Sequence, residues 1–480
     1  MTKIVQSDNY SADFGNCLRS SAIFWYPPPS IARTKIVLSN YWLFKNNIKT
    51  LLIASFRNHN GQLLGRQLID FDASNIYILN APLGFDLEQG GSVEVEAFGN
   101  ENLRIPYAAV MAIYETNESL SMVHSYSRIY SPWEIEEERT IQDGHEACWS
   151  LKDTKDIYSF AVLHNGGHPQ CKQIARLVVK NYDADALTHD IHIPQLSPYE
   201  TFLIKPVDYI DNIIEFLGGQ PGSATLCYKL NGAFTRMLVG WHSLNNGQLQ
   251  VTHSNFNYAI HETGLINSRK EEFAYMHVPL APFACQSVVY PDYNPGSYYI
   301  QSICDKRNLS RPVSLSGARQ IFEGSAFKFW RQDGLLPTRI VTAIEGVSSP
   351  TDLGIPCECS LGVVHSKRPP KHFHWGVCHS GLPSRLLIVT YSEIYGEPDE
   401  LSTLSVKVLV NGKTFEKTLI WKDININSRA SILMAELFPT LMNPEDAQDF
   451  GYITIHSSYG GFMMFTCIQK NNSWALEHTF

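Results

Sequence analysis

The stretch NESLSMVHSYS (residues 117–127) places Leu120, Met122 and His124 on alternate positions. Alternate residues of a β-strand point to the same face of the sheet. The pattern therefore predicts a strand whose terminal histidine shares a face with apolar side chains. That face is expected to be the core side, where an imidazole needs hydrogen-bond partners such as loop carbonyls.

The alternation recurs along the chain, which indicates an internal repeat. The histidine-containing copies are residues 117–127 with His124, NGQLQVTHS (246–254) with His253, the weaker LGVVHS (361–366) with His365, and NNSWALEHTF (471–480) with His478. One interpretation is a structural clip, repeated at the last hairpin of each unit. The alternative is a shared ligand site. Units in a row would hold equivalent residues apart by the width of a domain. Closure into a ring would favour the shared site.

Three further signals accompany each histidine. A strand-like run precedes it, and in three copies the polar turns TNES, LNNG and KNNS separate the two strands, as in a tight hairpin. A glycine opens an alternating segment further upstream, at Gly91, Gly222, Gly324 and Gly451. A β-rich run lies near the front of each copy: residues 33–42, 173–182, 297–304 and 384–391.

These repeats predict an all-β chain of about four related Ig-like β-sandwich domains, because units of about 100 residues with frequent turns suit two packed sheets. A high aromatic content of 12% favours strands as well. Single-sheet propeller blades usually need only about 40 to 50 residues. Short crossover helices are expected near 208–217 and 431–438. The expected units are 20–130, 145–260, the shorter and divergent 275–368, and 370–480.

Composition limits the possible partners. The formal net charge is −9 and no long basic stripe occurs, so nucleic acid is not expected as a partner. No apolar run reaches the length of a membrane span or signal peptide, which predicts a cytoplasmic protein by default. The ten cysteines do not recur at equivalent places and are expected to be mostly reduced.

Two clusters of cysteine and histidine could bind zinc, although neither matches a standard zinc spacing. The denser one lies near residues 357–379, and its alternative is a polar loop with free thiols. The other lies in HNGGHPQC (164–171), which is equally compatible with a plain turn. No cofactor other than zinc is expected. The candidate ligands are Cys357, Cys359, His365, His372, His374, Cys378 and His379 in the first cluster, and His164, His168 and Cys171 in the second.

Aromatic clusters are the candidates for partner recognition, because exposed rings suit sugar faces and protein surfaces. Adjacent aromatics on a strand point to opposite faces, so at least one member of each cluster is expected at the surface, with core packing as the alternative. The candidate ligand-binding residues are Trp25, Tyr26, Trp330, Phe373 and Trp375.

The favoured function is therefore a non-enzymatic, multi-domain binding or assembly protein that recognises a glycan or a protein partner. The alternative is a zinc-type enzyme acting on carbohydrate, with its site near residues 357–379. No phosphate-binding loop, dinucleotide-binding motif or nucleophile elbow occurs in the sequence, so no catalytic residue is assigned.

Overall fold

The computed structural model confirms the all-β class. It describes residues 18–478 except 49, 70–75, 83, 100–108, 125–126, 131–141, 145, 231–236, 257–272, 292–293, 295, 304–312, 315–318, 323, 333–335, 337–339, 347–357, 363, 366–368, 425–428 and 443–448. Within these residues the strands form eight antiparallel sheets, which fall into four pairs. We number the pairs units 1 to 4 in chain order. Most residues between the predicted units at 131–144 and 261–274 lie outside the described part.

Units 1 and 2 share one strand order. In unit 1 the first sheet runs β4-β3-β6-β1-β9 and the second runs β5-β2-β7-β8. In unit 2 the corresponding orders are β14-β13-β16-β11-β19, with β10 also paired to β16, and β15-β12-β17-β18. The strands are β1 (Leu18–Tyr26), β2 (Arg33–Ser39), β3 (Leu51–Asn58), β4 (Leu63–Ile69), β5 (Ile76–Leu79), β6 (Gly91–Gly99), β7 (Met111–Glu115), β8 (Leu120–His124), β9 (Ser127–Tyr130), β10 (Gln142–Gly144), β11 (Glu146–Leu151), β12 (Ile157–His164), β13 (Gln173–Lys180), β14 (Ala186–Ile193), β15 (Thr201–Ile204), β16 (Gly222–Leu230), β17 (Leu238–Ser243), β18 (Leu249–His253) and β19 (Asn255–Phe256).

Units 3 and 4 repeat this order, except that the described part of unit 4 has no ninth strand. Unit 3 has the sheets β23-β22-β25-β20-β28 and β24-β21-β26-β27, and unit 4 has β29-β34-β31-β32 and β33-β30-β35-β36. The strands are β20 (Phe273–His277), β21 (Cys285–Val289), β22 (Tyr298–Ser302), β23 (Val313–Ser314), β24 (Gln320–Phe322), β25 (Ala326–Arg331), β26 (Val341–Gly346), β27 (Glu358–Gly362), β28 (Val364–His365), β29 (Phe373–His379), β30 (Ser384–Thr390), β31 (Thr403–Val410), β32 (Lys413–Ile420), β33 (Arg429–Leu433), β34 (Phe450–Ser457), β35 (Phe462–Lys470) and β36 (Ser473–His478).

The predicted strand equivalences hold for the sixth and seventh strands of each unit but not for the front strand. Residues 33–42 and 384–391 contain β2 and β30, the second strands of units 1 and 4. Residues 173–182 and 297–304 contain β13 and β22, the third strands of units 2 and 3. The second and third strands are similarly rich in β-branched and aromatic residues, so the pattern could not separate them.

Short helices occur where the chain passes between sheets. The helices are α1 (Tyr41–Asn46), η2 (Pro206–Asp208), α3 (Ile213–Leu217), α5 (Ser392–Tyr395), α6 (Trp421–Ile424), α7 (Met434–Leu437) and η5 (Pro439–Met442). Both predicted crossover helices exist, as α3 and α7, each between the fifth and sixth strands of its unit. The start of the second predicted segment is strand β33. No helix in the described part of the chain is long and apolar enough to cross a membrane.

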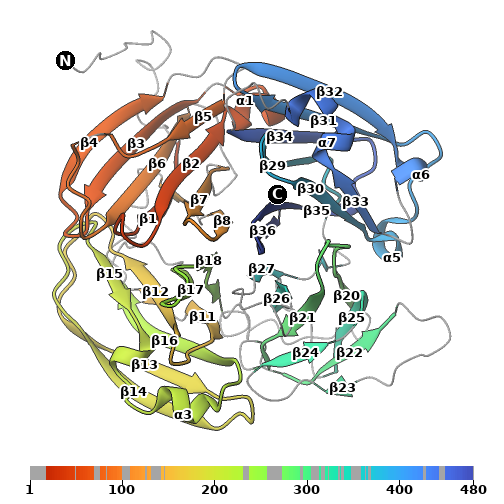
Figure 1. The fold of residues 1–480 in the computed structure, drawn as a ribbon. Helices are drawn as coiled ribbons and strands as arrows, with labels where there is room; N and C mark the ends of the chain where they lie inside the picture. The colour runs from red at the N-terminus through yellow and green to blue at the C-terminus, as the bar shows by residue number, and fades with distance from the viewer. Residues whose placement is uncertain are drawn as a thin grey trace.

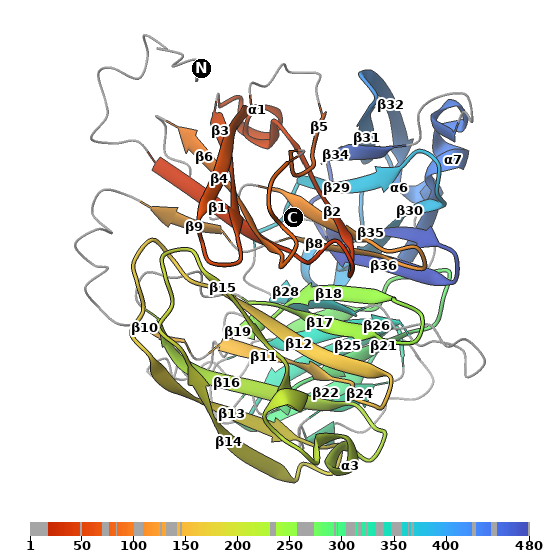
Figure 2. The same ribbon diagram turned by 60° about the vertical axis from the view of Figure 1, so that its left-hand side comes forward.

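The four units are arranged in a closed ring (Figure 1). The eighth strands of the units, β8, β18, β27 and β36, lie around the centre, and we call them the inner strands. Each inner strand contacts the inner strands of both neighbouring units. The view turned by 60° shows β18 of unit 2 below β8 of unit 1 and β36 of unit 4 (Figure 2). Each unit is a two-sheet sandwich, so the ring differs from a propeller of single-sheet blades.

Apolar cores continue across the boundaries between units. Phe160 and Val251 of unit 2 belong to the core of unit 1, and Trp375 of unit 4 packs in one cluster with Val37 of unit 1. One cluster likewise joins units 3 and 4, and a smaller one joins units 2 and 3. Removal of apolar surface from water at every boundary favours closure of the ring.

Ser121 of β8 and Ser119, just before β8, hydrogen-bond to the free edge of β18. The Ser121 hydroxyl accepts from the Val251 N–H (2.8 Å) and donates to the Val251 carbonyl (3.1 Å). The Ser119 hydroxyl makes the same pair of bonds to Leu249, at 3.0 Å and 3.3 Å. An edge strand has unpaired backbone groups that must find partners when buried. These two serines supply them between units 1 and 2.

A buried charge network joins units 2 and 3. The Glu345 carboxylate pairs with Lys152 of unit 2 and with Arg319 of unit 3. It also accepts a hydrogen bond of 2.9 Å from Gln286. Burial alone would raise the pKa of Glu345. The charges of Lys152 and Arg319 outweigh burial and lower this pKa to about 2. Buried charges of this kind are tolerated only when they are paired.

Replacing Ser121 by alanine should weaken closure of the ring, because the backbone groups of Val251 lose their partners. We expect the free energy of unfolding to fall by about 1 to 3 kcal/mol. Urea denaturation followed by tryptophan fluorescence measures it. Ser405→Ala is the control, since this hydroxyl donates to Glu416 at the surface. Equal stability of Ser121→Ala and Ser405→Ala would contradict the bridging role.

Candidate metal centre

Three of the repeated histidines end inner strands at the same register position. His124 pairs with Met111, His253 with Leu238 and His478 with Phe465. In each hairpin the histidine is the last residue of the eighth strand. Because the inner strands surround the axis of the ring, this register brings one imidazole from each of units 1, 2 and 4 to the centre.

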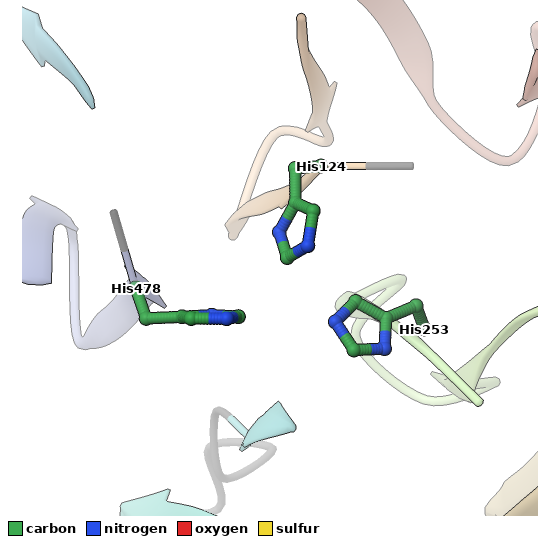
Figure 3. Close-up of side chains that lie close together, drawn as sticks. All are labelled: His124, His253 and His478. Atoms are coloured by element: carbon green, nitrogen blue, oxygen red, sulfur yellow. The ribbon is translucent and has the colours of Figure 1, made fainter. Parts of the chain in front are cut away.

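The three imidazoles converge (Figure 3). The ring centroid of His124 lies 4.7 Å from that of His253 and 4.8 Å from that of His478. The centroids of His253 and His478 are 6.1 Å apart. One nitrogen of each ring lies within 4.8 Å of the other two, and all three side chains are buried. Ring closure therefore brings these imidazoles together, whereas units in a row would hold them a domain width apart. His253 Nδ1 also lies 3.0 Å from the Ser254 carbonyl oxygen, as a structural clip requires.

A carboxylate lies between two of these histidines. Glu477 Oε1 is 3.2 Å from His124 Nδ1 and 2.7 Å from His478 Nδ1, and it accepts the His478 backbone N–H at 2.9 Å. Glu477 is completely buried, and burial alone would raise its pKa. The charges and hydrogen bonds of His124 and His478 outweigh burial and lower the pKa of Glu477 to about 2. The centre therefore holds an ionised carboxylate at neutral pH.

Unit 3 contributes a thiol to the same centre. Cys359 of β27 is buried, with its Sγ 3.5 Å from His478 Nδ1 and 3.6 Å from Glu477 Oε1. Together with Glu477 and His478 it forms a second group of ligand atoms that all lie within 4.8 Å of one another. All four units thus place at the axis a residue of a type that can bind a metal ion.

The fourth repeated histidine, His365, takes a different place. It lies on β28, where it pairs with Ala274 in the first sheet of unit 3. The position equivalent to His124 is Gly362, which pairs with Val341 at the start of β26. His365 lies three residues beyond this position, and the sequence between the two strands of this hairpin lacks the Asn-containing turn that fixes the register in the other units.

The donor set fits a divalent transition-metal ion. Imidazole, carboxylate and thiolate are the zinc ligands in proteins, and zinc–nitrogen bonds of about 2.0 to 2.1 Å require nitrogens about 3.3 Å apart. The rings would have to move inward by about 1 Å to reach such a geometry. A thiolate and a carboxylate would also cancel the charge of a divalent ion, as a buried site requires.

The predicted cysteine–histidine cluster does not gather at one point. Cys357 lies outside the described residues. The other members after Cys359 and His365 lie on or next to β29: His372 is exposed, His374 is buried against Phe462, Cys378 is in the core of unit 4, and His379 packs on Phe450. Among the described residues, the groups of three ligand atoms are the two at the centre. The physical reason is the extended strand: His374 and Cys378 share a face of β29 but are four residues, or about 13 Å, apart, and His379 points to the opposite face.

The second predicted cluster is also divided. His164 ends β12 and is buried, with Nδ1 3.1 Å from the Thr201 hydroxyl oxygen. His168 and Cys171 are exposed in the turn that follows. Burial lowers the pKa of His164 to about 3, so this side chain is neutral at physiological pH.

Most of the aromatic candidates are buried, contrary to the expectation that one member of each cluster is exposed. Tyr26 packs on Phe56 within unit 1, and Trp25 packs on Phe160 of unit 2, so a partner covers each face of β1. Phe373 and Trp375 pack on Tyr41 of unit 1. Trp330 is half-buried and stacks on Tyr299. Neighbouring units hide surfaces that an isolated sandwich would expose.

Glu477 was not among the candidates from the sequence. Alternation places it on the opposite face of the strand from Leu476 and His478, where a charged residue normally faces solvent. Cys359 was a candidate, but with other partners. The pairing of these two side chains depends on contact between units, which leaves no local pattern.

No family model matches the chain, and no curated protein matches its sequence.

The neutral state of His164 predicts a pH-dependent contribution to stability. The folded-state pKa of about 3 lies below the ordinary value of 6.5, so only the unfolded chain binds the proton between these values. The contribution of His164 to the free energy of unfolding should be constant above pH 6.5 and should decrease as the pH falls toward 3. His164→Gln removes this contribution and should show a shallower decrease in urea midpoint between pH 6.5 and 4. Parallel curves for the two proteins would reject the assignment.

Proposed function

We propose that the chain is a non-enzymatic assembly protein, a ring of four sandwich units that binds one divalent transition-metal ion of the zinc class at its centre. The observation that carries the proposal is the convergence of His124, His253 and His478 from three different units. Because these ligands come from different units, an ion bound to all of them would hold those units together. The ion would thereby stabilise the closed ring.

The burial of the donors supports a structural role for the ion. His253, Cys359 and Glu477 each expose 1% of their surface or less. Catalytic zinc sites keep a coordination position open to water or substrate, whereas structural sites are closed by protein ligands. A closed set of imidazoles, carboxylate and thiolate favours assembly over the carbohydrate-directed enzyme that the cysteine–histidine cluster suggested.

The wider role that we propose is binding of a glycan or protein partner by a rigid ring. Apolar cores and polar networks join each unit to its neighbours, which would hold the loops between strands in fixed positions. Preorganised loops of this kind support the proposal because they bind a partner with a smaller loss of conformational entropy. The burial of Trp25, Tyr26, Phe373 and Trp375 supports recognition by the loops rather than by these rings.

Metal analysis of protein purified without added metal tests the central ion. We expect about one equivalent of zinc per chain, loss of the ion in His253→Gln, and retention in His164→Gln, a buried histidine away from the centre. An ion that binds only the folded state stabilises it by about 4 kcal/mol when the free ion exceeds the Kd a thousandfold. Chelation should therefore lower the melting temperature of the wild type but not that of His253→Gln. Zinc-free protein that gains no stability from added zinc, cobalt or copper would overturn the proposal.

Cobalt substitution tests whether Cys359 is a ligand. A thiolate bound to cobalt gives a charge-transfer absorption, so the cobalt form of the wild type should show this band and Cys359→Ser should lack it. The matched control is Cys378→Ser, because Cys378 is equally buried and burial raises its pKa to about 12. The same spectrum in wild type and Cys359→Ser would show that the ion is bound without the thiol.

A further inference from the structure

A polar pocket lies where three units meet, apart from the candidate metal centre. It has a volume of about 360 Å³, and its polar lining includes Ser30, Arg33, Glu115, Asn117, Asn246 and Lys470. Its walls come from the turn between β1 and β2, from the β7–β8 and β17–β18 hairpin turns, and from the end of β35. Formation of the pocket therefore requires that units 1, 2 and 4 are docked.

The positive charges around the pocket outnumber the negative ones. Lys470 Nζ is 2.7 Å from Glu115 Oε1 and donates to the Thr116 carbonyl at 2.7 Å. Lys35 Nζ is 3.9 Å from the other oxygen of Glu115. Glu115 thus compensates one of these lysines. Glu118 belongs to the same turn but is not among the lining residues.

Arg33 adds a further positive charge at the pocket. Arg33 of β2 lies opposite Glu115 of β7 in the strand pairing. The Arg33 side chain is exposed and forms no ion pair with any residue that the structure describes. The guanidinium group presents donors in a planar fork that matches a carboxylate. A concave surface with excess positive charge concentrates anions, and it does so here on a chain whose net charge is −9.

We propose that this pocket binds a small molecule carrying a carboxylate, with Arg33 as the main anchor. The lining carries one net positive charge, from Arg33 and Lys470 against Glu115, which one carboxylate would neutralise. Ser30, Asn117 and Asn246 provide hydroxyl and amide groups for the polar remainder of the ligand. The volume suits a molecule of about one sugar ring or one amino acid. The carboxylate could belong to an acidic sugar or to a peptide terminus.

Calorimetric titration of the full chain with glucuronate, N-acetylglycine and glucose tests the proposal. We expect glucuronate or N-acetylglycine to bind, with the tighter of the two identifying the source of the carboxylate, and glucose to bind at least tenfold more weakly. Binding should weaken as salt is raised, because the anchor is electrostatic.

The matched variants are Arg33→Ala and Arg176→Ala, the second being an exposed arginine on unit 2 that lies 3.9 Å from Asp190. Arg33→Ala should raise the Kd about tenfold, as expected for loss of a charged hydrogen bond, and Arg176→Ala should leave it unchanged. The proposal is overturned if neither carboxylate binds, if glucose binds equally well, if inorganic phosphate binds more tightly than both, or if Arg33→Ala binds like the wild type. The circular dichroism spectrum of Arg33→Ala, which should match the wild type, confirms that the variant is folded.

Discussion

The inner strand of each unit is an edge strand, and its backbone groups and side chains can be buried only by neighbouring units. This constraint governs the rest of the structure. On β18, the hydroxyls of Ser119 and Ser121 provide the partners that a further strand paired with β18 would otherwise supply. On β8 and β36, apolar side chains are covered by the adjoining unit. A single unit removed from the ring would leave this strand exposed to water or to pairing with other chains.

The same constraint explains the chemistry at the axis. Each unit delivers the end of its inner strand to one place, so a residue that recurs at that register becomes a cluster rather than a set of isolated side chains. Three imidazoles in a buried space would repel one another if protonated, and the ionised Glu477 offsets that repulsion. Unit 3 breaks the symmetry with Gly362, and the space is approached by Cys359 instead. The centre therefore brings a carboxylate and a thiol together with the imidazoles.

Much of the fold was predictable from the sequence, because it depends on local patterns. Alternation around His124, the glycines that open the sixth strands, and the Asn-rich hairpin turns identified the repeat. Ring closure left no comparable signal: Ser121 and Glu477 look like surface residues until a second unit covers them. The same reason explains the error for Trp25, since alternation assigns side chains to faces but does not reveal that both faces of a strand are covered. His365 was misaligned because the divergent unit lacks the turn that sets the register.

The donors at the axis come from residues that are far apart in sequence, with His124 in unit 1 and His478 in the last inner strand. An unfolded polypeptide offers such donors at very low effective concentration, so it competes poorly for the ion. Nearly all of the binding free energy would then act on tertiary closure rather than on local structure. Folding of a ring of this kind has a high contact order in its final step, and the last unit to dock determines when coordination becomes possible.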